Sequence, residues 1–156
     1  MIIRQATIED NEEISCLLKQ ICALHQKERP DYFKENSKKY SEYEFYNIIK
    51  DNNRPVFVAV VENKILGYCF CIIKYISHPV LNDHKTLYID DFCVDETCRR
   101  QGLGQKLFEK ALWYAKQINA RYIELNVWDF NESAIKFYEQ CGFRTRSRKM
   151  EFLIEN

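Results

Sequence analysis

Four residues near position 100 have the types and spacing of an anion-binding loop. Gly102 and Gly104, two of only four glycines, stand where a helical pattern begins, and Arg99 and Arg100 precede them. Glycine lets a ligand approach the backbone closely, the amides at a helix start suit a phosphate, and arginine adds a forked cation. The pattern Arg-x-x-Gly-x-Gly is neither the Rossmann nor the Walker loop. By itself it fits a phosphate or pyrophosphate loop, or a turn with a solvated charge pair.

The segments around this loop alternate between strand and helix patterns. Strand patterns cover 2–6, 56–61, 65–76, 86–94 and 122–127, with one or two more within 143–154. Helical patterns cover 10–27, 41–50, 103–118 and 131–141, and Asp10 or Asn11 is expected to cap the first. Tight turns make the early strands antiparallel, whereas the crossover between 86–94 and 122–127 makes that pair parallel. We therefore expect an α/β (α+β) fold, with a mixed, mostly antiparallel, twisted sheet of six to seven strands and helices on both faces.

Composition narrows the class of protein. The 156 residues suit a single domain, 1–156, and 23 basic residues balance 23 acidic ones, so neither nucleic acid nor a membrane surface is an expected partner. The seven cysteines include no CxxC pair and no zinc-like spacing, so we expect reduced thiols and no metal site. No signal-peptide pattern and no long apolar run is present, which favours a cytoplasmic location.

The loop and its flanks together resemble the GCN5-related N-acetyltransferase (GNAT) family. Arg99-x-x-Gly102-x-Gly104 looks like the family's acetyl-CoA pyrophosphate loop. The upstream run 88–95 is similar to its central splayed strand, and the downstream run 125–143, with Asn131, Ala134, Phe137, Tyr138 and Gly142, resembles its closing strand–helix segment. The opening strand and the helix pair after it also fit, so the resemblance covers nearly the whole chain. Four co-linear elements make it more specific than the loop by itself. The resemblance implies the GNAT acyl-CoA N-acyltransferase fold and transfer of an acetyl group from acetyl-CoA to an amine.

The same resemblance implies which residues hold acetyl-CoA, the expected cosubstrate. The central strand would pair with the pantetheine arm, and a backbone N–H near Cys93 or Val94 would polarise the thioester carbonyl. The loop and the first helical turn would bind the pyrophosphate, and Asn131 would cap its helix and contact the arm. The implied cofactor residues are Phe92, Cys93, Val94, Arg99, Arg100, Gln101, Gly102, Leu103, Gly104, Gln105, Asn131, Ala134, Phe137 and Tyr138.

Asp90, Asp91 and Tyr138 are the candidate catalytic residues. An alkyl amine has a pKa near ~10 and arrives protonated, so a carboxylate is needed, directly or through water, to take its proton. Adjacent strand residues face opposite ways, so one aspartate is expected in the cleft, and we favour Asp90, although a bulge would change the assignment. An ordinary surface or salt-bridged aspartate is the alternative. Tyr138 would protonate the leaving thiolate; otherwise it is an amphipathic helix residue.

The acceptor is the least constrained part of the prediction. Asn126 and Trp128 end a strand beside the expected cleft and are candidate substrate contacts, as are residues 31–46 and 78–84. The three histidines are scattered and are expected in loop or surface positions. A small amine or amino-acid-like metabolite is the first expected acceptor; a protein N-terminus or lysine, and a non-catalytic acyl-CoA-binding module, stay open. The resemblance also implies a homodimer.

Overall fold

The computed structural model describes residues 1–155 of the chain. Contacts within the chain form two compact units, Met1–Asn126 and Val127–Asn156. The first unit contains all the strands of the described chain and three of its α-helices, and the second contains one α-helix.

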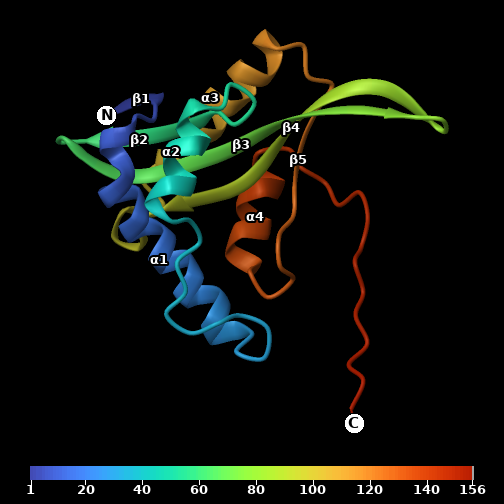
Figure 1. Cartoon of the computed structure of the whole chain (residues 1–156), viewed down its shortest axis with the longest axis horizontal. Helices are drawn as coiled ribbons and strands as arrows, with labels where there is room; N and C mark the ends of the chain where they lie inside the picture. Colours follow the sequence, from blue (N-terminus) through green and yellow to red (C-terminus); the bar gives the residue numbers. More distant parts are fainter. Residues whose placement is uncertain (156) are drawn as a thin grey trace. The chain divides into compact units, whose positions relative to one another are not determined.

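The first unit is built on one five-stranded sheet in the order β1-β2-β3-β4-β5 (Figure 1). Its strands are β1 (Ile2–Gln5), β2 (Val56–Val61), β3 (Lys64–His78), β4 (Leu81–Val94) and β5 (Tyr122–Leu125). The first four are antiparallel and β4 pairs with β5 in parallel. The tight turns predict this for β2, β3 and β4 and the crossover predicts it for β4 and β5, whereas β1 and β2 are separated by two α-helices. The mixed, mostly antiparallel sheet is thus confirmed.

The predicted number of strands was wrong, because the sheet has five and not six to seven. The missing strands are those expected within 143–154, where the described residues form neither helix nor strand. A strand exists only when its backbone groups pair with a neighbouring strand. Apolar residues of this segment, such as Phe152 and Leu153, are 90% and 78% exposed. Although the segment has a strand-like composition, its described residues pair with no strand.

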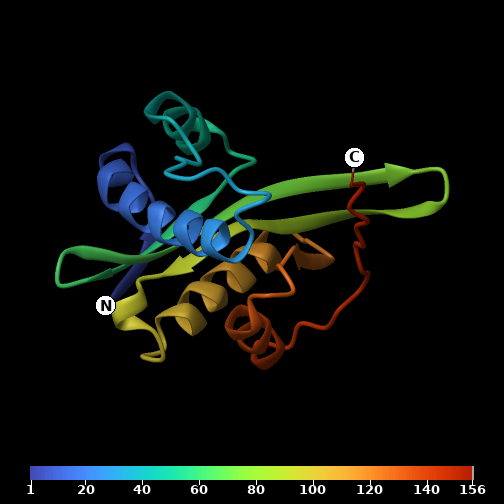
Figure 2. The ribbon, with the colours of Figure 1, turned by 90° about the horizontal axis from the view of Figure 1, so that it is seen from below.

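Helices cover both faces of the sheet in the first unit (Figure 2). α1 (Asn11–Glu28) and α2 (Glu42–Lys50) bury Ile14, Phe45 and Ile48 on one face, against alternate strand residues such as Val58 and Phe70. On the other face, α3 (Leu103–Gln117) contributes buried apolar residues, and its Tyr114 ring contacts Phe57. Two short 3-10 helices, η1 (Ile8–Asp10) and η2 (Glu96–Cys98), precede α1 and α3.

The helix starts follow local hydrogen bonding. Ser41 begins α2 as expected, because its hydroxyl accepts from the Glu44 amide at 3.2 Å while the Glu44 carboxylate accepts from the Ser41 amide at 2.7 Å. Asp10 occupies the N-cap position of α1, but its side chain makes no cap bond. It accepts instead from the Arg4 guanidinium at 2.6 and 2.8 Å, which ties the helix start to β1.

The second unit contains α4 (Glu132–Gln140). Asn131 caps it, as predicted, by accepting from the Ala134 amide at 3.2 Å. Gly142, with φ 96°, ends it, and the Gly142 amide bonds to Glu139 O at 2.9 Å. Among residues 1–155, no helix combines the length and apolar composition needed to span a membrane.

Candidate functional site

A β-bulge at Asp90 places both candidate carboxylates on one side of the sheet. The register of β3 and β4 pairs Phe70 with Asp91 but Cys71 with Ile89, so Asp90 is an extra residue without a partner in this ladder. The expectation that the two aspartates face opposite ways is therefore wrong. Both contact the same lysine from the segment between α1 and α2.

Asp91 is the more enclosed of the two, with 9% of its side chain exposed. Its Oδ2 lies 2.6 Å from Nζ of Lys39, and its Oδ1 accepts from the Tyr68 hydroxyl at 3.0 Å. Tyr68 is fully buried in β3. Both oxygens of Asp91 are thus bonded within the chain.

Asp90 keeps one oxygen open. The Tyr40 hydroxyl donates to its Oδ2 at 2.7 Å, and Lys39 Nζ approaches the same oxygen at 3.4 Å. Within residues 1–155, no hydrogen bond is directed at Oδ1, and 27% of the side chain is exposed. Of the two carboxylates, Asp90 is the one with an oxygen available to a substrate.

Charge and burial at the bulge shift the pKa values of its neighbours. Burial lowers the pKa of Lys39, but the Asp91 carboxylate more than offsets it, so the net shift is upward and the ammonium stays charged. Burial, assisted by Asp90, raises the pKa of Tyr40. Burial, assisted by Asp91, likewise raises the pKa of Tyr68. The two phenols are neutral donors at physiological pH.

Of the three histidines, His25 is not in a loop or on the surface as expected. His25 is half-buried on α1, stacks on Phe33 with centroids 5.0 Å apart, and has a pKa lowered by burial. His78 and His84 lie towards the far end of the long β3–β4 hairpin. His84 is six residues from Asp90 along β4, about 20 Å at the rise of a strand, so segment 78–84 is not brought to the carboxylates.

The end of β4 diverges from β5. Pairing with β5 stops at Ile89 and Leu125, whereas pairing with β3 continues to Val94. The point where the two strands separate is therefore followed by Phe92, Cys93 and Val94. These are the residues expected from the sequence to pair with the pantetheine arm. The Cys93 thiol faces α1, and burial, assisted by Asp91, raises its pKa to about 12, which disfavours a thiolate nucleophile.

The loop after β4 has the conformation of an anion cradle. Arg100 and Gly102 both have positive φ, 63° and 82°, and no heavy atom lies within 4 Å of a Cβ built on Gly102. In α3 the Lys106 amide bonds to Gly102 O, so the amides before Lys106 lack acceptors within the helix. Arg99, Arg100, Gln101 and Gly102 are exposed, whereas Leu103 is buried in the core. The open cradle fits a pyrophosphate.

Other contacts hold this loop in place. Asp95 accepts from the Thr97 amide at 2.9 Å and from Gln20 Nε2 on α1 at 2.9 Å. The Arg99 Nε donates to Val94 O at 3.2 Å. The loop is thus fixed to β4 and to α1, and sequence reasoning missed Gln20 because nothing in the helical pattern distinguishes it from an exposed glutamine.

The remaining predicted residues divide between the units. Asn126 is exposed after β5 in the first unit, near the Tyr88 hydroxyl. In the second unit, Trp128 stacks on Phe130 with centroids 5.7 Å apart. Tyr138 is half-buried on α4, and its ring contacts the rings of Phe137 and Phe143. Asn131, Ala134, Phe137 and Tyr138 therefore share one helix and its cap.

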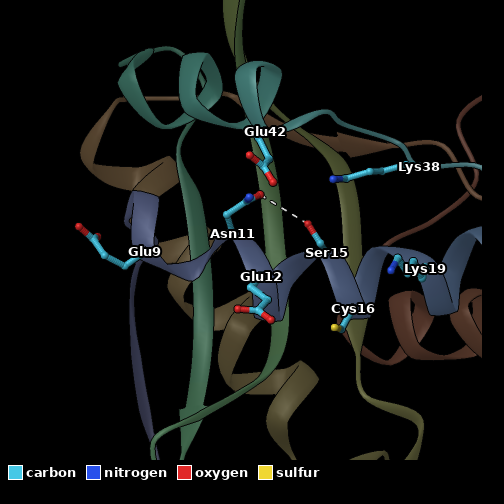
Figure 3. A pocket seen from close by; sticks show the side chains of 8 residues that line it. All are labelled: Glu9, Asn11, Glu12, Ser15, Cys16, Lys19, Lys38 and Glu42. Carbon is cyan, nitrogen blue, oxygen red and sulfur yellow. Dashed lines mark hydrogen bonds between the residues drawn. The ribbon is translucent and has the colours of Figure 1, made fainter.

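A separate groove of about 550 Å³ lies beside α1 and the start of α2. Figure 3 shows its lining, which carries charges of both signs: Glu9, Asn11, Glu12, Ser15, Cys16, Lys19, Lys38 and Glu42. It contains neither Asp90 nor Asp91, and we assign no chemistry to it. Within residues 1–155, no group of three or more His, Cys, Asp or Glu side chains is placed to hold a metal ion.

The chain is similar to known acetyltransferases. The model of the Acetyltransferase (GNAT) family matches residues 20–143. The relative named Uncharacterized N-acetyltransferase MJ1207, from Methanocaldococcus jannaschii, is 32% identical over 115 residues, which cover 74% of the chain and 49% of the relative. The X-ray structure of a tetramutant of the BH1408 protein from Bacillus halodurans is 37% identical, with a TM-score of 0.95 over 99% of this chain and 100% of that one.

Two further relatives differ in their named substrates. Human N-alpha-acetyltransferase 30 is 28% identical over 125 residues, covering 78% of the chain and 32% of the relative. The L-ornithine N5-acetyltransferase NATA1 of Arabidopsis thaliana is 30% identical over 94 residues, covering 60% of the chain and 41% of the relative. The chain spans half or less of the length of these three curated relatives.

Proposed function

The chain belongs to the GNAT family of acetyltransferases, and on that premise we propose that it transfers the acetyl group of acetyl-CoA to a primary amine. The acceptor is a small molecule or an amino-acid-like metabolite. The observation that carries this proposal is the bulge in β4, which gathers Asp90, Asp91 and Lys39 on one side of the sheet.

Acetyl-CoA supplies the activated acetyl thioester, and two parts of the first unit suit its binding. The cradle from Arg99 to Gln105 offers backbone amides, a helix N-terminus and two arginines for the pyrophosphate. The backbone of Phe92, Cys93 and Val94, where β4 leaves β5, suits an extended arm. An N–H at Cys93 or Val94 would polarise the thioester carbonyl, a term worth about 3 kcal/mol in other enzymes.

Asp90 would receive the acceptor amine. Its Oδ1 is open, whereas both oxygens of Asp91 are engaged. A carboxylate there attracts the ammonium and can accept its proton, directly or through water, so that the neutral amine becomes the nucleophile. Tyr138 would return a proton to the departing thiolate, and Asn126 and Trp128 would contact the acceptor. The cofactor roles of Asn131, Ala134 and Phe137 on α4 are part of the same proposal.

The likeness to N-alpha-acetyltransferase 30 favours a second candidate acceptor, the α-amino group of a protein or peptide. The likeness to the ornithine enzyme favours the first. A non-catalytic acyl-CoA-binding module remains the alternative to both. A cytoplasmic location and a homodimer stay predictions.

The test begins with thermal unfolding of the chain with and without acetyl-CoA, followed by thiol release with a panel of amines and peptides. We expect acetyl-CoA to raise Tm by mass action, and thiol release with one acceptor class. Asp90→Asn should keep the Tm rise but lower the rate of release by about 10²–10⁴-fold. Asp83 is an exposed aspartate on the same strand, and the control variant Asp83→Asn should keep both the Tm rise and the rate of thiol release.

The outcomes separate the alternatives. Absence of a Tm rise at saturating acetyl-CoA would remove the cofactor assignment and the role of the cradle. A rise without release for any acceptor would favour the binding module. Unchanged release in Asp90→Asn would remove Asp90 as the proton acceptor.

A further inference from the structure

Lys39 already shows how the bulge binds an ammonium group. Its Nζ lies 2.6 Å from Oδ2 of Asp91, 3.4 Å from Oδ2 of Asp90 and 3.4 Å from the Asp90 carbonyl oxygen. The Tyr40 ring lies to one side, with its centroid 5.3 Å from Nζ. Carboxylates, a carbonyl and an aromatic face are the groups that recognise a primary ammonium.

The net charge at the bulge favours binding of one more cation. Asp90 and Asp91 carry two negative charges and Lys39 carries one positive charge, so one negative charge is left uncompensated. The other titratable groups facing the cluster do not supply the missing charge. The pKa of His25 on α1 is lowered by burial, and Tyr40, Tyr68 and Cys93 are neutral.

Geometry selects where the second cation binds. The described contacts of the Asp90 carboxylate fall on Oδ2, and Oδ1 is open on a side chain that is 27% exposed. Lys39, in the segment between α1 and α2, occupies the place beside Asp91, with its Nζ 2.6 Å from the Asp91 Oδ2. The bulge therefore offers two places for an ammonium group. Lys39 fills the one beside Asp91, and Oδ1 of Asp90 is available to a ligand.

We propose that Lys39 is a specificity-determining residue that restricts the site to acceptors with a single ammonium group at the reacting end. This inference rests on the proposed function for the meaning of "acceptor", but its binding test does not need turnover. An acceptor with a second ammonium a few bonds away would meet the Lys39 ammonium, and like charges repel. Without Lys39, the same second ammonium would fill the vacated place beside Asp91.

The test compares butylamine with 1,4-diaminobutane, which have the same carbon chain but one or two ammonium groups. Affinities are measured by calorimetry at neutral pH on the full chain and on Lys39→Met, Lys39→Arg and Lys38→Met. We expect Lys39→Met to raise the diamine-to-monoamine affinity ratio about tenfold or more. Lys39→Arg keeps the charge and Lys38→Met removes a charge next to it in the sequence, so both should keep the original ratio.

An unchanged ratio in Lys39→Met, with its fold verified by circular dichroism, would overturn the inference, as would an equal rise in Lys38→Met. Absence of binding of the diamine to Lys39→Met would overturn it too. If the diamine-to-monoamine affinity ratio rises in Lys39→Met but no acetyl-CoA-dependent thiol release is found, the proposed function is refuted while the two places for an ammonium group are supported. If thiol release is found but the affinity ratio is unchanged in Lys39→Met, only this inference is refuted.

Discussion

Replacing Gly102 with alanine separates backbone strain from ligand binding. Gly102 has φ 82°, and no heavy atom lies within 4 Å of the position that a Cβ would take, so the added methyl meets nothing in the protein. The remaining cost is the left-handed backbone, about 1–2 kcal/mol for an L-residue. For a chain of this size that is a fall in Tm of about 2–8 °C.

The structure offers a matched control. Gly142 has φ 96° and also has nothing within 4 Å of an added Cβ, but it follows α4 in the second unit and is absent from the proposed cradle. Gly142→Ala should lower Tm by a similar amount. Only Gly102→Ala puts a methyl group into the space proposed for the pyrophosphate.

The assay is thermal unfolding at increasing acetyl-CoA concentration. At a hundredfold excess over Kd, a ligand adds about 2.7 kcal/mol of stability. We expect Gly102→Ala to weaken acetyl-CoA binding about tenfold or more, a loss of about 1.4 kcal/mol, and Gly142→Ala to retain wild-type affinity. Equal affinities in the two variants would refute the placement of the pyrophosphate at Gly102.

Three further predictions concern catalysis, packing and pH. Tyr138→Phe should lower kcat about 10²–10⁴-fold with an unchanged acetyl-CoA-induced Tm rise, and an unchanged kcat would exclude the acid role. Gly67→Ala puts a Cβ 2.9 Å from both Cys93 O and Leu107 Cδ1 and should cost about 1–3 kcal/mol in urea unfolding; a neutral effect would show that β3 and α3 shift easily. The pKa of Asp10 lies below its usual 3.8, chiefly through its hydrogen bond from Arg4, so its contribution is present above pH 3.8 and lost as the pH falls through the folded-state value. Asp10→Asn should therefore flatten the acid limb of stability against pH, and an unchanged slope would contradict this.

Local patterns predicted most elements of the fold because the forces that form them act over a few residues. The β-branched run 56–61 is β2, with the predicted bounds. Glu62 and Asn63, between the predicted strands 56–61 and 65–76, both have positive φ, 49° and 61°, as a tight hairpin requires. Gly102 precedes α3, and Asn131 caps α4.

Pairing was harder to predict because it depends on a partner distant in the sequence. Residues 143–154 have strand-like composition, but no neighbouring strand pairs with them in the described chain, so they are not part of the sheet. The bulge at Asp90 is likewise set by the register between β3 and β4. A one-residue change of register turns a side chain to the other face, and the run around Asp90 carries no local signal for it.

By itself, the sequence determined the order of the elements up to α4, the family resemblance and the glycine loop, because each of these depends on neighbours in the chain. The short turns between β2, β3 and β4 and the crossover before β5 also predicted the mixed sheet. Only the tertiary structure decided that both aspartates share one face and that Lys39, 52 positions before Asp91, lies between them. A lysine in a polar connecting segment looks like any solvated charge. Its partner is defined by how α1, α2 and the sheet pack, because only that packing brings the segment between the helices over the bulge.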